Sequence, residues 1–164
     1  MSSPAENCES SAVVRSHLDS WVVGSGADVI HFNCGLHDLR INPGSEAPAI
    51  TKFEYAANLE HIFRGIASLD CPIIWATTTP VNEGRHEASR PSRRREADVD
   101  RYNEIGLEVA ARHGAVINDL YAAVGDAGRD ELLADDGVHF TEGGYAVLAG
   151  CVEAAIRTVL TRTT

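Results

Sequence analysis

The fold is decided by an apolar stretch that ends in polar residues, Val29-Ile30-His31-Phe32-Asn33-Cys34-Gly35-Leu36-His37-Asp38. Its first half is too short and too apolar for a surface helix, so we predict a buried strand over 27–34. Similar runs over 72–79 and 115–118 predict two further strands. Patterns over 11–23, 53–69, 96–113 and from 141 onward predict amphipathic helices. This alternation indicates an α/β fold with a parallel sheet.

Polar residues follow each of these strands, and ligands of parallel sheets bind beyond the carboxyl ends of the strands. The last such group is Asp136-Gly137-Val138-His139, close to the start of the C-terminal helix. An aspartate three residues before a histidine can orient and charge-stabilise an imidazole base. We therefore predict catalytic roles for His139 and Asp136. The structural alternative for Asp136 is an acidic residue that only stabilises a helix start.

Several motifs, taken together and in order, resemble the SGNH (GDSL-type) hydrolases, a family of serine esterases and lipases. They are Gly35-Leu36-His37-Asp38, Tyr55-Ala56-Ala57-Asn58-Leu59, Trp75-Ala76-Thr77-Thr78-Thr79-Pro80, Arg101-Tyr102-Asn103, Asn118-Asp119-Leu120-Tyr121 and the Asp136–His139 block. The resemblance implies a three-layer, flavodoxin-like α/β fold with a parallel sheet. It also implies hydrolysis of carboxylic esters by a Ser-His-Asp mechanism without metal or cofactor. Its substrate would be a small-molecule ester or an acylated carbohydrate.

The sequence departs from the family at its N-terminal blocks. The Gly-Asp-Ser block that carries the serine is not present, so we expect one SGNH-like domain over 1–164 that is N-terminally incomplete and lacks its first two strands. The segment 5–11 resembles the second block but has no glycine. In the third block, His37 stands where the family has an asparagine. His37, Asn7 and Gly35 are the candidates for oxyanion and substrate contacts.

Other residues near the predicted site have structural interpretations that we weigh against functional ones. Ser10 and Ser11 are expected to cap a helix, Cys34 to pack in the core, and Asp38 to brace its loop. The segment 81–95 is predicted to be a solvated loop rich in arginine. Two alternative functions stay open. One is a non-catalytic binding module, and the other is a metal-dependent hydrolase whose ligands would be His37, Asp38, Asp136 and His139.

Composition limits the possible partners. The chain has 164 residues, 44% hydrophobic residues and a formal net charge of −10, which argues against a nucleic-acid partner. No run of 18 apolar residues is present, so no membrane span is expected. The cysteines Cys8, Cys34, Cys71 and Cys151 form no C-x-x-C pair and are expected to be free thiols. The strand over 27–34 would have an exposed edge, which predicts self-association.

Overall fold

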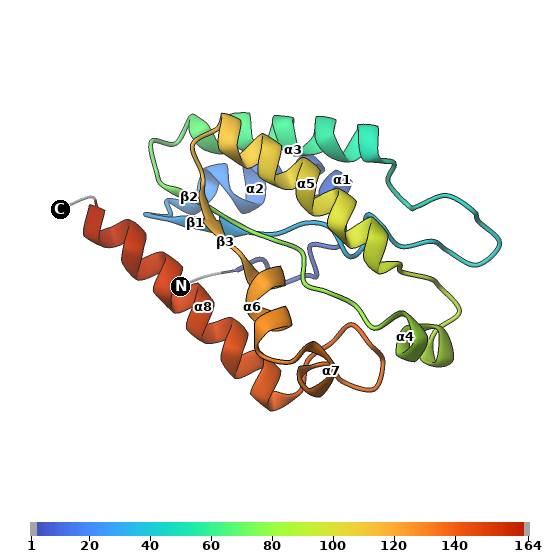
Figure 1. Ribbon diagram of the computed structural model, residues 1–164. Helices are drawn as coiled ribbons and strands as arrows, with labels where there is room; N and C mark the ends of the chain where they lie inside the picture. The colour runs from blue at the N-terminus through green and yellow to red at the C-terminus, as the bar shows by residue number, and fades with distance from the viewer. Residues whose placement is uncertain (1–2, 163–164) are drawn as a thin grey trace.

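The structure is a computed structural model that describes residues 3–162, and its centre is a parallel sheet of three strands (Figure 1). The strands are β1 (Ile30–Phe32), β2 (Ile73–Ala76) and β3 (Val116–Asn118), in the order β1-β2-β3. The predicted α/β fold with a parallel sheet is confirmed. β1 is shorter than expected. Beyond Phe32 the side chain of Asn33, rather than the backbone of β1, donates to the Ala76 carbonyl of β2 at 2.8 Å.

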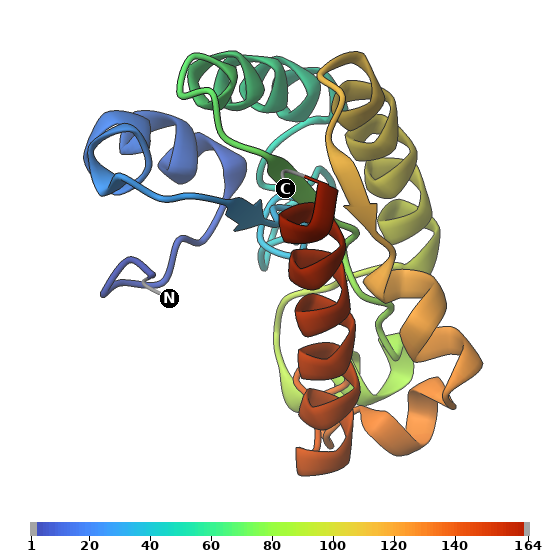
Figure 2. The same cartoon turned by 90° about the vertical axis from the view of Figure 1, so that its left-hand side faces the viewer.

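Helices cover the two faces of the sheet. On one face, α3 (Lys52–Ala67) lies beside α5 (Glu96–Arg112), and on the other face α8 (Glu142–Arg162) runs along the sheet and packs against β3 (Figures 1 and 2). Trp75 of β2 is fully buried between these layers. Its ring centroid lies 5.1 Å from that of Phe32 and 5.8 Å from that of Phe63. This aromatic cluster fixes the helices of the first layer on the sheet.

The start of α3 is set by a local signal in the sequence. Thr51 accepts a hydrogen bond from the backbone of Glu54, and the Glu54 carboxylate accepts one from the backbone of Thr51 at 2.9 Å. This capping box satisfies two backbone donors that a helix start leaves free. The buried face of α3 then follows the predicted spacing and consists of Tyr55, Asn58, Leu59, Ile62, Phe63 and Ile66.

The predicted helix over 11–23 is broken into α1 (Ser11–Ser16), α2 (Leu18–Trp21) and the 3-10 turn η1 (Val23–Ser25). The break falls at His17, whose backbone leaves the helical region with φ −111° and ψ 11°. Just before it, the hydroxyl of Ser16 donates to the Val13 carbonyl at 2.8 Å. Such local side-chain bonds compete with the helix ladder and favour its interruption.

The prediction of a loop over 81–95 is wrong in part, because this segment contains α4 (Glu83–Ser89). Asn82 caps α4 by accepting from the Arg85 backbone at 3.0 Å. The guanidinium of Arg85 donates to the carbonyls of Asp130, at 2.8 Å, and Leu133, at 3.1 Å. α4 has no apolar stripe, so hydrogen bonds to a distant part of the chain hold it in place. Two short helices, α6 (Leu120–Asp126) and α7 (Arg129–Leu132), occupy the region between β3 and α8.

Helix α8 is more exposed than the sequence suggested. Tyr145 and Leu160, two of its large apolar residues, are 53% and 49% exposed. Between Glu142 and Thr161, α8 is also long and apolar enough, by composition alone, to cross a membrane, with a mean hydropathy of 1.3. Yet Glu153 and Arg157 form an ion pair at 2.7 Å midway along it. Charged groups at that depth are costly in hydrocarbon, so composition is weak evidence for a span.

Two glycines in helices allow a test of how tightly α5 packs on the sheet, with α8 as the comparison. A Cβ added at Gly106 of α5 would lie 2.7 Å from Cζ2 of the buried Trp75, whereas one at Gly150 of α8 would meet nothing within 4 Å. Alanine in a helix gains about 1 kcal/mol over glycine, but overpacking a core costs about 1–3 kcal/mol. We expect Gly106→Ala to lower the free energy of unfolding in urea and Gly150→Ala to raise it. Stabilisation by both changes would show that the Trp75 ring moves freely.

Candidate active site

The site is built around the pair Asp136 and His139, in the loop that leads into α8. Oδ2 of Asp136 lies 2.5 Å from Nδ1 of His139. Oδ1 of Asp136 accepts from the backbone N–H groups of His139 at 2.9 Å and Val138 at 3.2 Å. A carboxylate can only accept, so Nδ1 carries a proton, and in the neutral imidazole Nε2 is then the nitrogen with the lone pair. Nε2 has no hydrogen-bond partner among residues 3–162, and the His139 side chain is 66% exposed.

Asp136 is held in its ionised form. Partial burial alone would raise its pKa, but the hydrogen bonds from the backbone and imidazole of His139 and from the Val138 backbone outweigh this effect. They keep the pKa of Asp136 well below its usual range. Nη2 of Arg90 adds a positive charge 3.7 Å from Oδ2. A permanently charged Asp136 can stabilise a proton on His139.

Helix α4 positions this loop. Gly137 has φ +73°, and a Cβ there would lie 2.4 Å from the Asn82 carbonyl oxygen. This close approach allows the Asn82 N–H to donate to the Gly137 carbonyl at 2.8 Å. Nδ1 of His86, on α4, lies 3.2 Å from the Asp136 carbonyl oxygen. Only glycine fits at position 137, because the position combines a left-handed backbone with a neighbouring main chain.

A cavity of about 310 Å³ opens beside His139 and brings together residues from distant parts of the sequence. His37 and Asn7, both predicted site residues, line it. Gly35, the third candidate for this role, does not line it. Gly35 instead packs between the strand ends, where a Cβ would lie 1.9 Å from Oγ1 of Thr78. The complete lining is Asn7, Leu36, His37, Arg40, His86, Arg90, Ser92, Arg94, Val138 and His139.

Asn7 and His37 each have a donor available in this cavity. Oδ1 of Asn7 accepts from the Glu9 backbone at 2.9 Å, which fixes the amide and leaves Nδ2 as a donor. Burial, together with the charges of Arg94 and Arg40, lowers the pKa of His37. A neutral imidazole still carries one N–H. Both residues can therefore donate a hydrogen bond to an oxygen that develops negative charge.

Asp38 lies apart from this cavity and is fully buried. Its Oδ1 accepts from the backbone N–H of Ser11 at 2.9 Å and from the Ser11 hydroxyl at 2.5 Å. Burial raises the pKa of Asp38 to about 6, although these bonds oppose the shift. Asp38 thus ties β1 to the start of α1.

The ligand set proposed for a metal, His37, Asp38, Asp136 and His139, is not assembled. No three His, Cys, Asp or Glu side chains within 3–162 are placed to share an ion.

Sequence reasoning missed Ser92, which lines the cavity with its Oγ 3.3 Å from Nε2 of His86. That imidazole cannot activate it, because Nη1 of Arg94 already donates to the same Nε2 at 2.9 Å. Ser11 is engaged by Asp38, and the Ser10 side chain makes no cap bond, contrary to expectation. No serine hydroxyl in the described part of the chain is hydrogen-bonded to His139.

The sequence predicted that the arginines of 85–95 would be solvated, but two of them contact other parts of the protein. Arg94 is only 8% exposed, and its Nε donates to the Leu36 carbonyl at 2.7 Å. Arg90 reaches Asp136, as described above. The high density of arginine in an otherwise acidic chain was the one sequence signal for these contacts. It could not be interpreted without the fold, which brings this segment to the strand ends.

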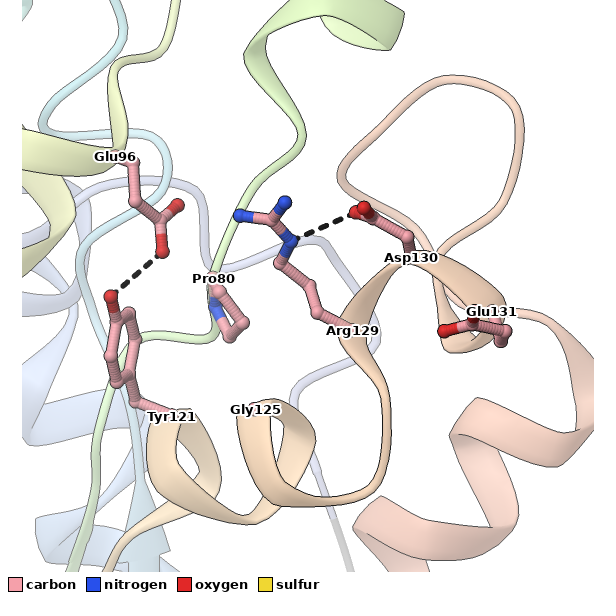
Figure 3. A pocket seen from close by; sticks show the side chains of 7 residues that line it. All are labelled: Pro80, Glu96, Tyr121, Gly125, Arg129, Asp130 and Glu131. Atoms are coloured by element: carbon pink, nitrogen blue, oxygen red, sulfur yellow. Dashed lines mark hydrogen bonds and ion pairs between the residues drawn. The ribbon is translucent and has the colours of Figure 1, made fainter.

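A second cavity, of about 400 Å³, lies away from His139 between α6, α7 and the start of α5 (Figure 3). Four of its polar side chains are paired with one another: the Tyr121 hydroxyl donates to Glu96 at 2.7 Å, and Arg129 donates to Asp130 at 2.9 Å. Glu96 also accepts from the Val81 backbone at 2.7 Å. These groups hold α6 and α7 in place, and the cavity by His139 is the better candidate site.

A parallel α/β fold with an aspartate-held histidine beyond its strand ends is an arrangement typical of α/β hydrolytic enzymes. The model of the GDSL-like lipase/acylhydrolase family matches residues 8–147, and the chain belongs to this family. The resemblance noted in the sequence is thereby confirmed, as is the SGNH hydrolase fold. No curated protein matches the chain.

Solved structures of related fold agree with this family. A lipase/acylhydrolase from Enterococcus faecalis is 25% identical, with a TM-score of 0.75 over 90% of this chain and 71% of that one. The acetylxylan esterase Axe2 from Geobacillus stearothermophilus is 18% identical, with a TM-score of 0.71 over 90% of this chain and 67% of that one. The enzyme LAE5 from the metagenome of Lake Arreo is 21% identical, with a TM-score of 0.73 over 89% of this chain and 67% of that one.

Proposed function

We propose that this domain hydrolyses carboxylic esters by a Ser-His-Asp mechanism, with His139 as general base and Asp136 as the residue that orients it. The observation that carries the proposal is the 2.5 Å contact between Asp136 and Nδ1 of His139, which leaves Nε2 beside a cavity and without a partner among residues 3–162. The serine would be supplied by a residue outside these 164. The chain as written would then be inactive, since none of its described serines is bonded to His139.

The proposed chemistry assigns a task to each side chain. A serine hydroxyl attacks the ester carbonyl while Nε2 of His139 takes its proton. Nδ2 of Asn7 and the N–H of His37 donate to the oxyanion that forms, and the Gly35 backbone holds the strand end that carries His37. His139 then gives the proton to the departing alcohol. Water repeats these steps on the acyl-enzyme and releases the acid.

A small-molecule ester or an acylated carbohydrate is the proposed substrate. The open cavity by His139 supports a small substrate, and the fold similarity to acetylxylan esterases supports an acetyl ester. The test uses the polypeptide that runs from any in-frame Gly-Asp-Ser block upstream of Met1 through Thr164. It should hydrolyse 4-nitrophenyl acetate and lose this activity when that serine becomes alanine.

The alternative function is a non-catalytic binding module built on the same fold. It is favoured by the same observation, that no serine of the described residues is bonded to His139. A fluorophosphonate probe, which labels only activated serines, distinguishes the hydrolase from the binding module. Labelling of the longer polypeptide supports the hydrolase. An unlabelled protein that still binds ligands in the cavity would support the module.

We also propose self-association through the free edge of β1. In the described part of the chain β1 pairs only with β2, and a groove of about 470 Å³ follows its other side, lined by residues such as Trp21, Val29 and Phe32. An unpaired apolar edge tends to pair with another chain. We expect the 164-residue chain to sediment as a concentration-dependent dimer or larger species. Val29→Lys, in the groove, should weaken this association, and Val23→Lys, on η1, should not. A monomer at every concentration would refute the proposal.

A further inference from the structure

The cavity by His139 carries more positive charge than its surroundings compensate. Arg40, Arg90 and Arg94 all line it, in a chain whose formal net charge is −10. Asp136 is the acidic group that forms an ion pair there, and it is shared between Arg90 and His139. Glu9, which is exposed, acts on His37 from a distance. Clustering of like charges against the overall charge of a protein needs a cause.

Arg94 is the most buried of these cations. Its Nε and Nη1 donate to a carbonyl and to the neutral His86, so neither bond supplies a negative charge. No carboxylate among residues 3–162 forms an ion pair with it. Burial lowers the pKa of Arg94 to about 10, and the charges of Arg40 and Arg90 act in the same direction, although the charge of Asp136 opposes them. A buried cation without a paired anion is costly, unless a ligand supplies the missing charge.

Arg40 supplies independent evidence that this cavity can bind an anion. Its Nε is buried and has no hydrogen-bond partner within 3–162, and its guanidinium forms no ion pair with the described residues. Buried N–H groups without partners are rare in folded proteins, and an absent ligand is one accepted cause. Arg40 lines the same cavity as His37 and Arg94, so its guanidinium belongs to the candidate site.

We propose that Arg40 and Arg94 form an anion subsite that selects ester substrates carrying a carboxylate, phosphate or sulfate group. Guanidinium groups bind such oxygens with strong, charge-assisted hydrogen bonds, often in pairs. The subsite shares its cavity with His139, so an anion held there places the ester of the same small molecule near Nε2. This inference rests on the proposed ester hydrolysis for the substrate, but the anion site itself does not need catalysis.

The test is therefore a binding measurement on the chain as it stands. Inorganic phosphate and acetate are titrated separately at neutral pH against chloride of equal ionic strength, and the ring C–H resonances of the histidines are followed by NMR. We expect saturable shifts at His37 and His139 and none at His61, which is exposed on α3. The stronger-binding ion shows whether a phosphate-like group or a carboxylate is preferred.

A matched pair of variants locates the site. Arg40→Gln should weaken phosphate binding about tenfold or more, as expected for loss of a charge-assisted hydrogen bond. Arg64→Gln should leave it unchanged, because Arg64 lies on the surface of α3 with a side chain that is 76% exposed. The absence of saturable shifts in the unmodified chain, or equal binding by both variants, would overturn the subsite.

The two proposals can fail separately. Ester hydrolysis by the longer polypeptide with no preference for anionic over neutral esters overturns the substrate class and leaves the hydrolase in place. Phosphate binding that moves His37 and depends on Arg40, without ester hydrolysis, supports the anion site and overturns the proposed function. The NMR titration of the unmodified chain does not depend on whether Arg40→Gln folds.

Discussion

The 164-residue chain is expected to hydrolyse 4-nitrophenyl acetate without a burst, at a rate on the order of a million-fold below that of an intact serine esterase. Loss of the nucleophile costs about this much in a serine protease whose other groups are in place. In this chain Nε2 of His139 has no serine partner within 3–162, so no hydroxyl is activated. Stopped-flow and steady-state assays of the purified chain provide the measurement.

Four substitutions test the candidates for a substitute nucleophile: Ser10→Ala, Ser11→Ala, Ser92→Ala and Cys34→Ala. Cys34 is a poor candidate because burial raises the pKa of its thiol well above the usual value, so no thiolate is present at neutral pH. Robust hydrolysis that any one of these changes abolishes would contradict the prediction and identify a nucleophile inside the chain.

In the longer polypeptide that carries the serine, Asp136→Asn is expected to lower kcat by about ten-thousand-fold. The asparagine oxygen can keep the hydrogen bonds from the backbone of Val138 and His139, so the loop should retain its shape. Its NH₂ group would then face Nδ1 of His139. Two donors cannot share that contact, and the proton moves to Nε2, where it blocks the base.

Asp135→Asn is the matched control. It removes the same charge one residue earlier, from a side chain that is exposed and has no hydrogen bond in the described structure. We expect kcat to change little, while circular dichroism and thermal melts show that both variants fold. Equal losses in the two variants would mean that negative charge near the loop, rather than the contact with Nδ1, supports activity.

The sequence by itself determined the elements whose causes are local. Periodicity placed α3 and α5, and short apolar runs placed the three strands, although their ends were set by contacts such as that of Asn33. The pairing of Asp136 with His139 was also predictable. Three residues separate them, so one loop turn brings the carboxylate to Nδ1 without help from the rest of the chain.

Local reasoning failed where the cause lies far away in the sequence. Helix α4 has no apolar stripe and depends on bonds from Arg85 to carbonyls near α7. Ser11 reads as a helix cap, but its hydroxyl is committed to Asp38, 27 residues away. α8 shows a wide apolar face, and yet Tyr145 and Leu160 remain exposed, because the described residues bring no element to cover them.

Only the tertiary structure decided the character of the candidate site. Asn7, His37, Arg40 and Arg94 come from segments that the sequence cannot place relative to one another, and the sheet collects them beside His139 at its carboxyl edge. Composition favours arginine on the surface, whereas the fold buries Arg94 and leaves Nε of Arg40 without a partner in the part of the chain that the structure describes. Burial and distance set the strength of the interaction between two charges, and both are properties of the folded chain.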